Sequence, residues 1–317
     1  MTMMEETEIG FPFIKGMTYG FLSNKGDWSN TKAFESFDIM KDSLNINTVI
    51  LPVVAWQNNS QSTIIDFSGN LTVSDWEITH MIDYAHKKGL RVILKPMISL
   101  LDNSGRAYIN FFDNDVPFEP SWNDWFRNYS KFILHMAKIA AETDCSILSV
   151  GCGLVQSERR ENQWRELIAD VRKVFSGFIT YNSDKFQEDK IKWWDAVDVI
   201  SASGYYAPED FAPQLERIKT VVSSYKKPSL FLEAGCPSRA GASSCPNNLA
   251  HTGPANVREQ AEYYKKLFSI TKNLSWFYGF GLWNWPLDIY SKANADFDDT
   301  FCVYGKEAQN IIRIAYA

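Results

Sequence analysis

The sequence predicts a single-domain (β/α)8 barrel, the TIM barrel of the α/β class. Eight short apolar runs alternate with amphipathic segments along the chain, which is typical of a parallel sheet covered by helices. The length of 317 residues suits one barrel with loop insertions, and no long Pro-, Gly- or Ser-rich linker divides the chain. We expect residues 13–317 to form the barrel and residues 1–12 to form a flexible N-terminal extension.

The apolar runs are the predicted strands. In chain order they are residues 13–21, 47–56, 91–98, 145–151, 177–182, 196–205, 229–235 and 276–285. A doubly wound sheet would show the same alternation, but it usually carries a glycine-rich turn after its first strand. The stretch "YGFLSNKGDW" that follows the first run has no G-x-G-x-x-G motif. The pattern therefore favours the barrel.

The segments between the runs carry helix signals. Ser74 and Glu77 have the spacing of a capping box, and the helix that they open is predicted to end at Lys87, Lys88 and Gly89. Further helices are predicted wherever apolar residues recur at helical spacing. Three such faces are Trp125, Tyr129, Phe132, Ile133 and Met136; Trp164, Leu167, Ile168, Val171 and Val174; and Leu215, Ile218, Val221, Val222 and Tyr225.

Composition excludes several classes of partner. The net charge is −6 and no basic stripe is present, so we expect no binding to nucleic acid. We expect no membrane association either, since no stretch reaches the ~20 apolar residues of a span. The N-terminal "MTMMEETEIGFPF" lacks a signal peptide's basic and apolar regions. This predicts a cytoplasmic protein, with secretion possible only if a signal has been removed.

Cysteine and aromatic usage bears on the chemistry. The five cysteines are dispersed without metal-ligand spacing, so we expect reduced thiols and neither a metal nor an organic cofactor, although Cys236 and Cys245 flank one loop and could pair. The chain holds 11 Trp, 14 Tyr and 21 Phe. Such an aromatic excess suits a flat apolar ligand face, for example that of a sugar ring.

Candidate site residues follow from the barrel itself, because its active sites lie at the carboxyl ends of the strands. Glu233 closes the apolar run "SLFLE", where an acid serves either a catalytic purpose or a structural hydrogen-bonding one. The loop at 236–256 follows it and is predicted to form a wall of the site. The residues expected to shape the sugar sites are Tyr19, Trp56, Lys95, Cys152, Asn182, Tyr205, Tyr206 and Trp283. The four histidines, His80, His86, His135 and His251, are expected to be spectators.

Four motifs resemble glycoside hydrolase family 113, the TIM-barrel β-mannanases. They are "KGMTYG", "GCGLVQSERRENQWRELI", "FLEAGCPSR" and "LWNWP", and the likeness runs from about residue 15 to residue 310. The resemblance implies a retaining glycosidase that acts on β-1,4-mannan or manno-oligosaccharides, with Glu233 as the nucleophile. It also implies an acid/base glutamate after Cys152, a position that Gly153 occupies here.

The missing carboxyl predicts a strongly impaired enzyme, because the loss of general acid catalysis costs about 10²–10⁴ in rate. We favour an engineered inactive variant over natural loss, since the rest of the apparatus is intact. Glu158, Glu161 and Asp184 are the neighbouring acids that could substitute, although the first two fit a charged helix start. The alternatives are a non-catalytic carbohydrate-binding barrel, or pseudoenzyme, and a glycosidase of other β-glycan specificity.

Overall fold

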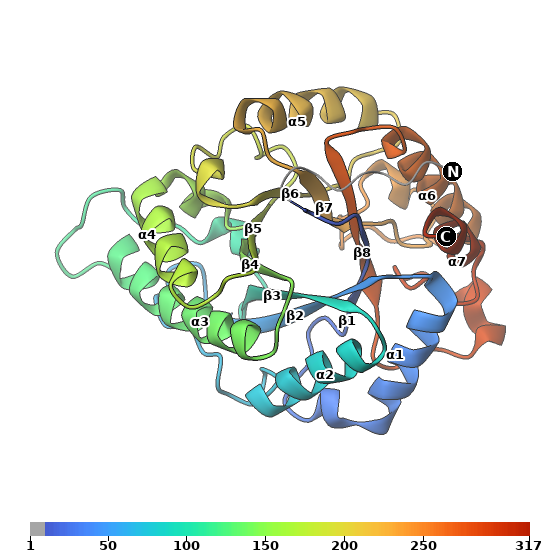
Figure 1. Ribbon diagram of the computed structural model, residues 1–317, viewed down its shortest axis with the longest axis horizontal. Coiled ribbons are helices and arrows are strands. Elements are labelled where there is room, and N and C mark those ends of the chain that lie inside the picture. Colours follow the sequence, from blue (N-terminus) through green and yellow to red (C-terminus); the bar gives the residue numbers. More distant parts are fainter. Residues whose placement is uncertain (1–9) are drawn as a thin grey trace.

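Eight parallel strands close into a barrel in the computed structural model, which describes residues 10–317. Each strand pairs with the next one in the chain, and β8 pairs with β1 (Figure 1). The predicted (β/α)8 barrel is confirmed. The strands are β1 (Ile14–Tyr19), β2 (Thr48–Gln57), β3 (Arg91–Leu100), β4 (Ile147–Cys152), β5 (Phe178–Ser183), β6 (Val199–Ser203), β7 (Ser229–Ala234) and β8 (Phe277–Trp285).

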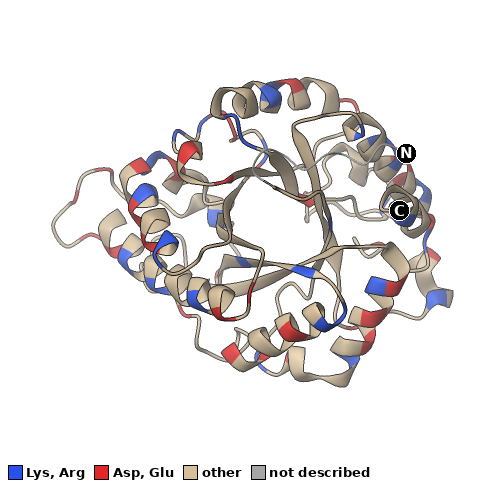
Figure 2. Cartoon of the chain, in the orientation of Figure 1, with Lys and Arg blue, Asp and Glu red and all other residues tan. Residues whose placement is uncertain are grey.

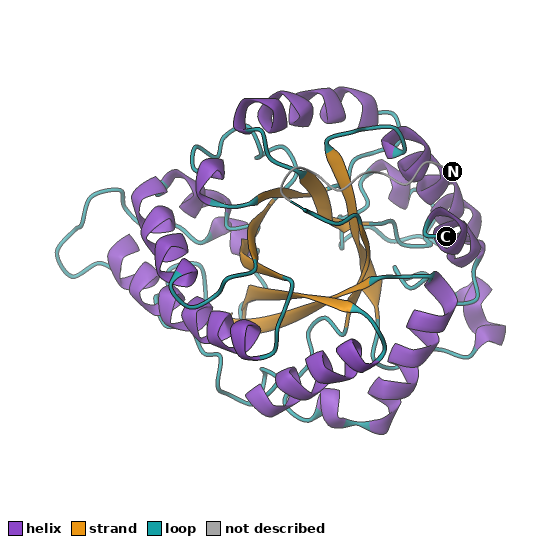
Figure 3. Ribbon diagram, in the orientation of Figure 1, coloured by secondary structure: helices purple, strands orange, loops and turns teal. Residues whose placement is uncertain are grey.

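Helices surround the barrel on its outside (Figure 3). Those of residues 10–317 are α1 (Thr31–Leu44), α2 (Asp75–Lys87), α3 (Trp122–Glu142), α4 (Glu161–Arg172), α5 (Phe211–Tyr225), α6 (Val257–Thr271) and α7 (Glu307–Ala315). The connection from β5 to β6 departs from the regular repeat, because it holds the short 3-10 helix η4 (Trp194–Ala196) where an α-helix would stand. Trp194 of this turn is fully buried, so the turn covers the outer face of the barrel as a helix would.

The predicted helix signals act as expected. Ser74 caps α2, with its side chain and that of Glu77 forming the reciprocal hydrogen bonds of a capping box. The predicted apolar faces of α3 and α5 are buried or lie against the core. Val174 is an exception: it lies beyond the end of α4, and 38% of its surface is exposed.

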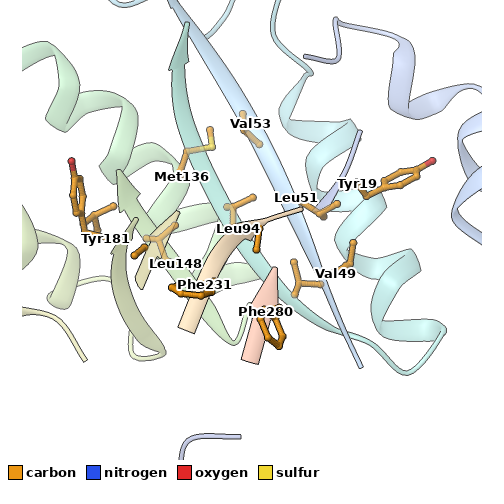
Figure 4. Packing of buried hydrophobic residues seen from close by; sticks show 14 of the residues in the cluster. Tyr19, Val49, Leu51, Val53, Leu94, Met136, Leu148, Tyr181, Phe231 and Phe280 are labelled. Atoms are coloured by element: carbon orange, nitrogen blue, oxygen red, sulfur yellow. The ribbon is translucent and has the colours of Figure 1, made fainter. Parts of the chain in front are cut away.

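Side chains alternate between the two faces of the barrel wall. On β2, Val49, Leu51 and Val53 point to the helices and belong to the large outer core (Figure 4). Ile50, between them, points into the barrel and packs with the first residues of other strands in an inner apolar layer. This layer fills the amino-terminal end of the barrel, so the open end lies where the strands finish.

The described chain begins to pack before β1. Phe11 is fully buried, and its ring lies 5.0 Å from that of Phe178 and 5.9 Å from that of Tyr278. Residues 1–9 of the expected flexible extension lie outside the described residues. A cavity of about 510 Å³ also opens at this amino-terminal end, lined by residues that include Arg91, Asp144 and Asp198. It lies at the end opposite the carboxyl ends of the strands.

Charged residues of both signs are interspersed over the helices and loops (Figure 2). None of the helices within residues 10–317 has the length and apolarity needed to cross a bilayer. All five cysteines are free thiols, so Cys236 and Cys245 do not pair. Cys236 is buried while Cys245 is exposed.

Candidate active site

Glu233 lies at the carboxyl end of β7, and only 7% of its surface is exposed. Lys95, at mid-strand on β3, directs its Nζ at Glu233 Oε1 over 2.5 Å. The same Nζ donates to Asn182 Oδ1 at 3.0 Å, and Asn182 in turn donates to Ser203 Oγ at 3.0 Å. Side chains from four strands, β3, β5, β6 and β7, therefore meet in one buried polar network around a single carboxylate.

A β-bulge turns Glu233 into the barrel. Strict alternation along β7 would place Glu233 on the same side as Phe231, which faces the helices. The pairing of β7 with β8 shifts register between Phe231 and Ala234, and the pairing with β6 shifts opposite Ser203. Leu232 and Glu233 consequently both face the interior. An irregularity of this kind re-aims a side chain, and bulges are frequent next to active sites.

The surroundings of Glu233 favour its charged form. Burial alone would raise the pKa of this carboxyl. The positive charges of Lys95 and Arg106, with the hydrogen bonds from Lys95 and Cys152, outweigh burial and hold the pKa below its usual value. Glu233 is therefore ionised at neutral pH, as a carboxylate nucleophile must be.

Cys152 reaches the same carboxylate from β4. Its Sγ–H donates to Glu233 Oε1 at 3.2 Å. A register shift between Ser149 and Cys152 turns this side chain inward, as the bulge on β7 does for Glu233. Burial, followed by the negative charge of Glu233, raises the pKa of the thiol to about 12. Cys152 is therefore a neutral hydrogen-bond donor here rather than a thiolate.

The two glycines beside Cys152 have different surroundings. A Cβ on Gly151 would lie 2.9 Å from Tyr129 Oη and 2.9 Å from Tyr181 Cε2, so the packed outer layer leaves room for glycine alone. Gly153 differs, because it has φ +61° and a Cβ there would meet only Arg106 within 4 Å, its Nε at 3.5 Å and its Cδ at 3.9 Å. A Cβ at residue 153 would therefore make ordinary van der Waals contact with Arg106 rather than clash with the packed outer layer.

Arg106 was not predicted from the sequence. It begins the short 3-10 helix η2 (Arg106–Tyr108) in the loop between β3 and α3, away from any strand end. Its Nη1 donates to the Ile98 carbonyl at 3.0 Å. Burial lowers the pKa of Arg106, but the nearby carboxylates of Glu233 and Asp184 help to raise it above its usual value. The sequence offers no signal for this residue beyond its place in a loop after a barrel strand.

Aromatic and aliphatic side chains line the interior above the charged network. Trp283 is 9% exposed, its ring lies 4.6 Å from that of Phe21, and Lys95 Nζ lies 5.7 Å from its ring centroid. Trp56, which was predicted to bind sugar, lies at the edge of this cluster with its Nε1 donating to the Leu71 carbonyl. The buried members of the cluster are Val54, Met97, Cys152, Tyr205 and Trp283.

Two of the expected sugar-site residues are not brought together with the others. Tyr19 points away from the interior: its hydroxyl donates to the Ala33 carbonyl and its ring packs 5.1 Å from Phe37. Tyr206 also faces outward, and its hydroxyl donates to the buried carboxylate of Glu188 at 2.7 Å. Both tyrosines belong to the packing between barrel and helices, so we do not retain them as sugar-binding residues.

The neighbouring acids take different places. Glu158, on the 3-10 helix η3 (Val155–Arg159), is buried behind the barrel wall and accepts a hydrogen bond from Tyr181 at 2.8 Å. Tyr181 itself packs between Trp164 and Trp193 in the outer layer. Burial raises the pKa of Glu158 to about 8. Because its partner Tyr181 lies in the outer layer, the Glu158 carboxyl points away from the position beside Gly153.

Glu161 and Asp184 are the other two acids that could substitute for a missing acid/base residue. Glu161 opens α4 and forms an ion pair with Arg165 at 2.8 Å. Asp184 is half-buried after β5, and burial raises its pKa; the charge of Glu233 raises it further, while that of Arg106 lowers it. Asp184 is therefore close enough to Glu233 for the two carboxyls to interact electrostatically.

Loops from neighbouring strands close the rim. The loop at 236–256 contains the 3-10 helix η5 (Ala242–Ser244), and Asn247 accepts a hydrogen bond from Lys185 after β5. Arg239 in the same loop pairs with Asp299 beyond β8. Within residues 10–317, no group of three or more His, Cys, Asp or Glu side chains is placed to hold a metal ion.

Comparison with known families agrees with this geometry. The model of Glycoside Hydrolase Family 113 matches residues 17–306. The chain belongs to this family. The matched residues include both the end of β4, which Gly153 follows, and the end of β7, where Glu233 lies.

Solved structures extend the match over the whole barrel. A family 113 β-1,4-mannanase, solved as a complex, is 47% identical to this family 113 chain with a TM-score of 0.95, covering 96% of this chain and 99% of that one. The family 113 β-mannanase from Alicyclobacillus acidocaldarius in complex with ManMIm is 35% identical, with a TM-score of 0.94 and coverage of 98% and 99%. A β-glucuronidase from Ruminococcus gnavus, at 14% identity and a TM-score of 0.63, shares the fold alone. A search of curated proteins found no significant match.

Proposed function

We propose that this family 113 chain carries the apparatus of a retaining glycoside hydrolase for β-1,4-mannan or manno-oligosaccharides, with Glu233 as its nucleophile and the acid/base position vacant at Gly153. One observation carries the proposal. Glu233 is a buried, ionised carboxylate held by Lys95 and Cys152 at the open end of the barrel. The family 113 relatives described as β-mannanases support the choice of substrate.

In the first displacement, the Glu233 carboxylate attacks the anomeric carbon and the glycosidic oxygen departs. That oxygen leaves as an alcohol only if a nearby acid protonates it, and retaining enzymes place this acid about 5–5.5 Å from the nucleophile. Gly153 supplies no carboxyl group. Substrates with acidic leaving groups need little protonation, so they should form the glycosyl-enzyme while ordinary mannosidic bonds react slowly.

In the second displacement, water must lose a proton as it attacks the glycosyl-enzyme. The residue that protonates the leaving group normally accepts this proton. Without it, we expect the covalent intermediate on Glu233 to accumulate. A dinitrophenyl β-mannoside should therefore release one equivalent of dinitrophenol in a burst, followed by slow turnover.

The decisive experiment replaces Gly153 in two ways. Gly153→Glu restores a carboxyl, whereas Gly153→Ala adds a side chain without one. Both place an L-residue at φ +61°, at a conformational cost of roughly 1–2 kcal/mol, so alanine controls for backbone strain. We expect Gly153→Glu to hydrolyse manno-oligosaccharides at least about 10²-fold faster than Gly153→Ala, with retained anomeric configuration by NMR.

A carbohydrate-binding barrel without turnover is the second candidate, favoured by the lack of a carboxyl side chain at Gly153. It predicts that manno-oligosaccharides bind while dinitrophenyl β-mannoside gives no burst. It also predicts that a folded Gly153→Glu protein stays inert. Both results together would overturn the proposed hydrolase.

A further inference from the structure

The space beside Gly153 contains a cation that no carboxylate neutralises at close range. Within residues 10–317, and apart from its two chain neighbours, Arg106 is the only residue that a Cβ on Gly153 would meet within 4 Å. Among residues 10–317, no carboxylate oxygen lies within 4.0 Å of its guanidinium, and its one side-chain hydrogen bond goes to the Ile98 carbonyl. A guanidinium carries five N–H donors, so most of those on Arg106 stay available to a ligand.

Two other cations of the barrel are instead paired with carboxylates at close range. Lys95 lies 2.5 Å from Glu233, and Arg217 pairs with Glu188 and Asp189 at 2.6 and 3.0 Å. Arg106 faces Glu233 and Asp184 only at longer range, through electrostatic interaction. Half-buried positive charge without an ion pair favours a negative ligand, and the planar fork of arginine suits two oxygens of one oxyanion.

We propose that the free N–H groups of the Arg106 guanidinium, beside Gly153, bind an inorganic oxyanion, and that this anion accepts the glycosyl group in place of water. The binding part stands on the geometry alone, whereas the acceptor part rests on the proposed function of Glu233. A carboxylate at residue 153 would repel an anion from this space. Its absence, together with Arg106, makes the acid/base position an anion site.

The chemistry needs no general base. In the glycosyl-enzyme, the anomeric carbon is bonded to a carboxyl oxygen of Glu233. An oxygen of hydrogen phosphate attacks that carbon, the bond from the carbon to Glu233 breaks, and its electron pair returns to the carboxylate. The product is a glycosyl phosphate with the configuration of the original bond, and no proton moves. Water cannot react in this way, because it must lose a proton.

Binding is tested first, with inorganic phosphate as the probe and calorimetry as the measurement. We expect Arg106→Gln to bind phosphate at least tenfold more weakly than the wild type, and Arg106→Lys to bind with intermediate affinity. Arg313→Gln removes an exposed arginine in α7 and should bind as the wild type does. Equal phosphate affinity in the wild type and Arg106→Gln would overturn the site.

Transfer is tested with dinitrophenyl β-mannoside in phosphate or in chloride at equal ionic strength. We expect phosphate to raise steady-state turnover at least tenfold with saturation, and ³¹P NMR to show a glycosyl phosphate, in the unmodified chain. In Arg106→Gln, the ratio of the two rates should fall toward one. Phosphate that binds without forming this product, while the burst is present, would overturn the acceptor role.

The two arms separate this proposal from the proposed function. Absence of a burst in the unmodified chain would remove Glu233 as nucleophile and the acceptor role with it. The calorimetric comparison of Arg106→Gln with Arg313→Gln would still decide whether the oxyanion site exists.

Discussion

The ends of β4 and β7 share a backbone irregularity but carry different side chains. Each ends in a register shift that turns one side chain inward, Cys152 on β4 and Glu233 on β7. The end of β7 supplies a carboxylate with a lysine and a thiol as partners. The end of β4 supplies a glycine with positive φ beside an arginine. In the proposed mechanism the two strand ends are the two carboxylate positions, and Gly153 leaves the position after β4 without a side chain.

The acid nearest to Gly153 in the following turn does not occupy the position beside it. Glu158 lies only five residues after Gly153, yet it is buried behind the wall against Tyr181. A turn after a barrel strand directs successive side chains to opposite layers, so closeness in sequence does not give closeness to the reacting atoms. Substitutions test this comparison at four positions, which are Glu233, Lys95, Glu158 and Tyr19.

The largest effect is expected at Glu233. Glu233→Gln keeps the shape and one hydrogen-bond acceptor but removes the nucleophilic charge. The burst rate with dinitrophenyl β-mannoside should fall by on the order of 10³-fold or more, because the covalent step requires the carboxylate. Stopped-flow absorbance measures the burst. A burst of undiminished rate would show that the end of β7 does not carry the nucleophile.

The next effect is expected at Lys95, which holds Glu233 in its ionised form. Lys95→Met leaves a buried carboxylate without its cation, so the free energy of unfolding should fall by about 3–5 kcal/mol. The pKa of Glu233 should rise, because the charge that holds it down is removed. The acidic limb of the burst-rate profile should therefore move to higher pH.

Lys306 provides a matched control. Its side chain is as buried as that of Lys95 and pairs with Asp298 at 2.6 Å. Lys306→Met should also lower the free energy of unfolding, but it should leave the acidic limb in place. An equal shift of that limb in both variants would indicate general destabilisation and would contradict a specific role for Lys95.

A smaller effect, on stability rather than turnover, is expected at Glu158. Its pKa rises from an ordinary 4.5 to about 8 in the folded protein. Between these values the folded state keeps a proton that the unfolded state has lost, so this group makes stability fall by about 1.4 kcal/mol for each pH unit gained. Urea unfolding at pH 5 and pH 8 should show a smaller loss of stability in Glu158→Gln than in the wild type.

The same variant tests the position of Glu158. Its slow turnover of dinitrophenyl β-mannoside should match that of the wild type within about twofold, since the carboxyl lies in the outer layer. A large loss of turnover would mean that Glu158 reaches the reacting atoms. That result would break the comparison, because the end of β4 would then have a substitute acid.

The sequence predicted the barrel and its strands because the apolar runs are long and regular. It also predicted Glu233, Lys95 and Asn182 as residues at strand ends, and they meet in one network. Alternation along β3 and β5 is regular, so those side chains face the interior as a period of two requires. The bulges at Cys152 and Glu233 leave no mark in the sequence pattern, since they arise from pairing with neighbouring strands.

The two tyrosines that face outward have a different physical origin. Tyr19 shares the outer face with Met17, as regular alternation along β1 requires, and Tyr206 lies three residues beyond the end of β6. Arg106 comes from a loop, and its approach to Gly153 depends on how the loop after β3 folds over the barrel. The connection after β5 lacks an α-helix because its aromatic residues pack as a turn instead, with Trp193 stacked on Trp164 at 5.0 Å.

The smallest effect is expected at Tyr19, where the prediction from the sequence and the structure differ most. Tyr19→Phe removes the hydroxyl that donates to the Ala33 carbonyl, so the free energy of unfolding should fall by about 0.5–1.5 kcal/mol. The KM for dinitrophenyl β-mannoside should not change, because this ring faces the helices. Trp283→Ala, which removes a ring beside Lys95 in the interior, should instead raise KM severalfold. An equal rise in KM for Tyr19→Phe and Trp283→Ala would mean that the Tyr19 hydroxyl contacts the sugar. In that case β1 would also contribute a residue to the substrate site.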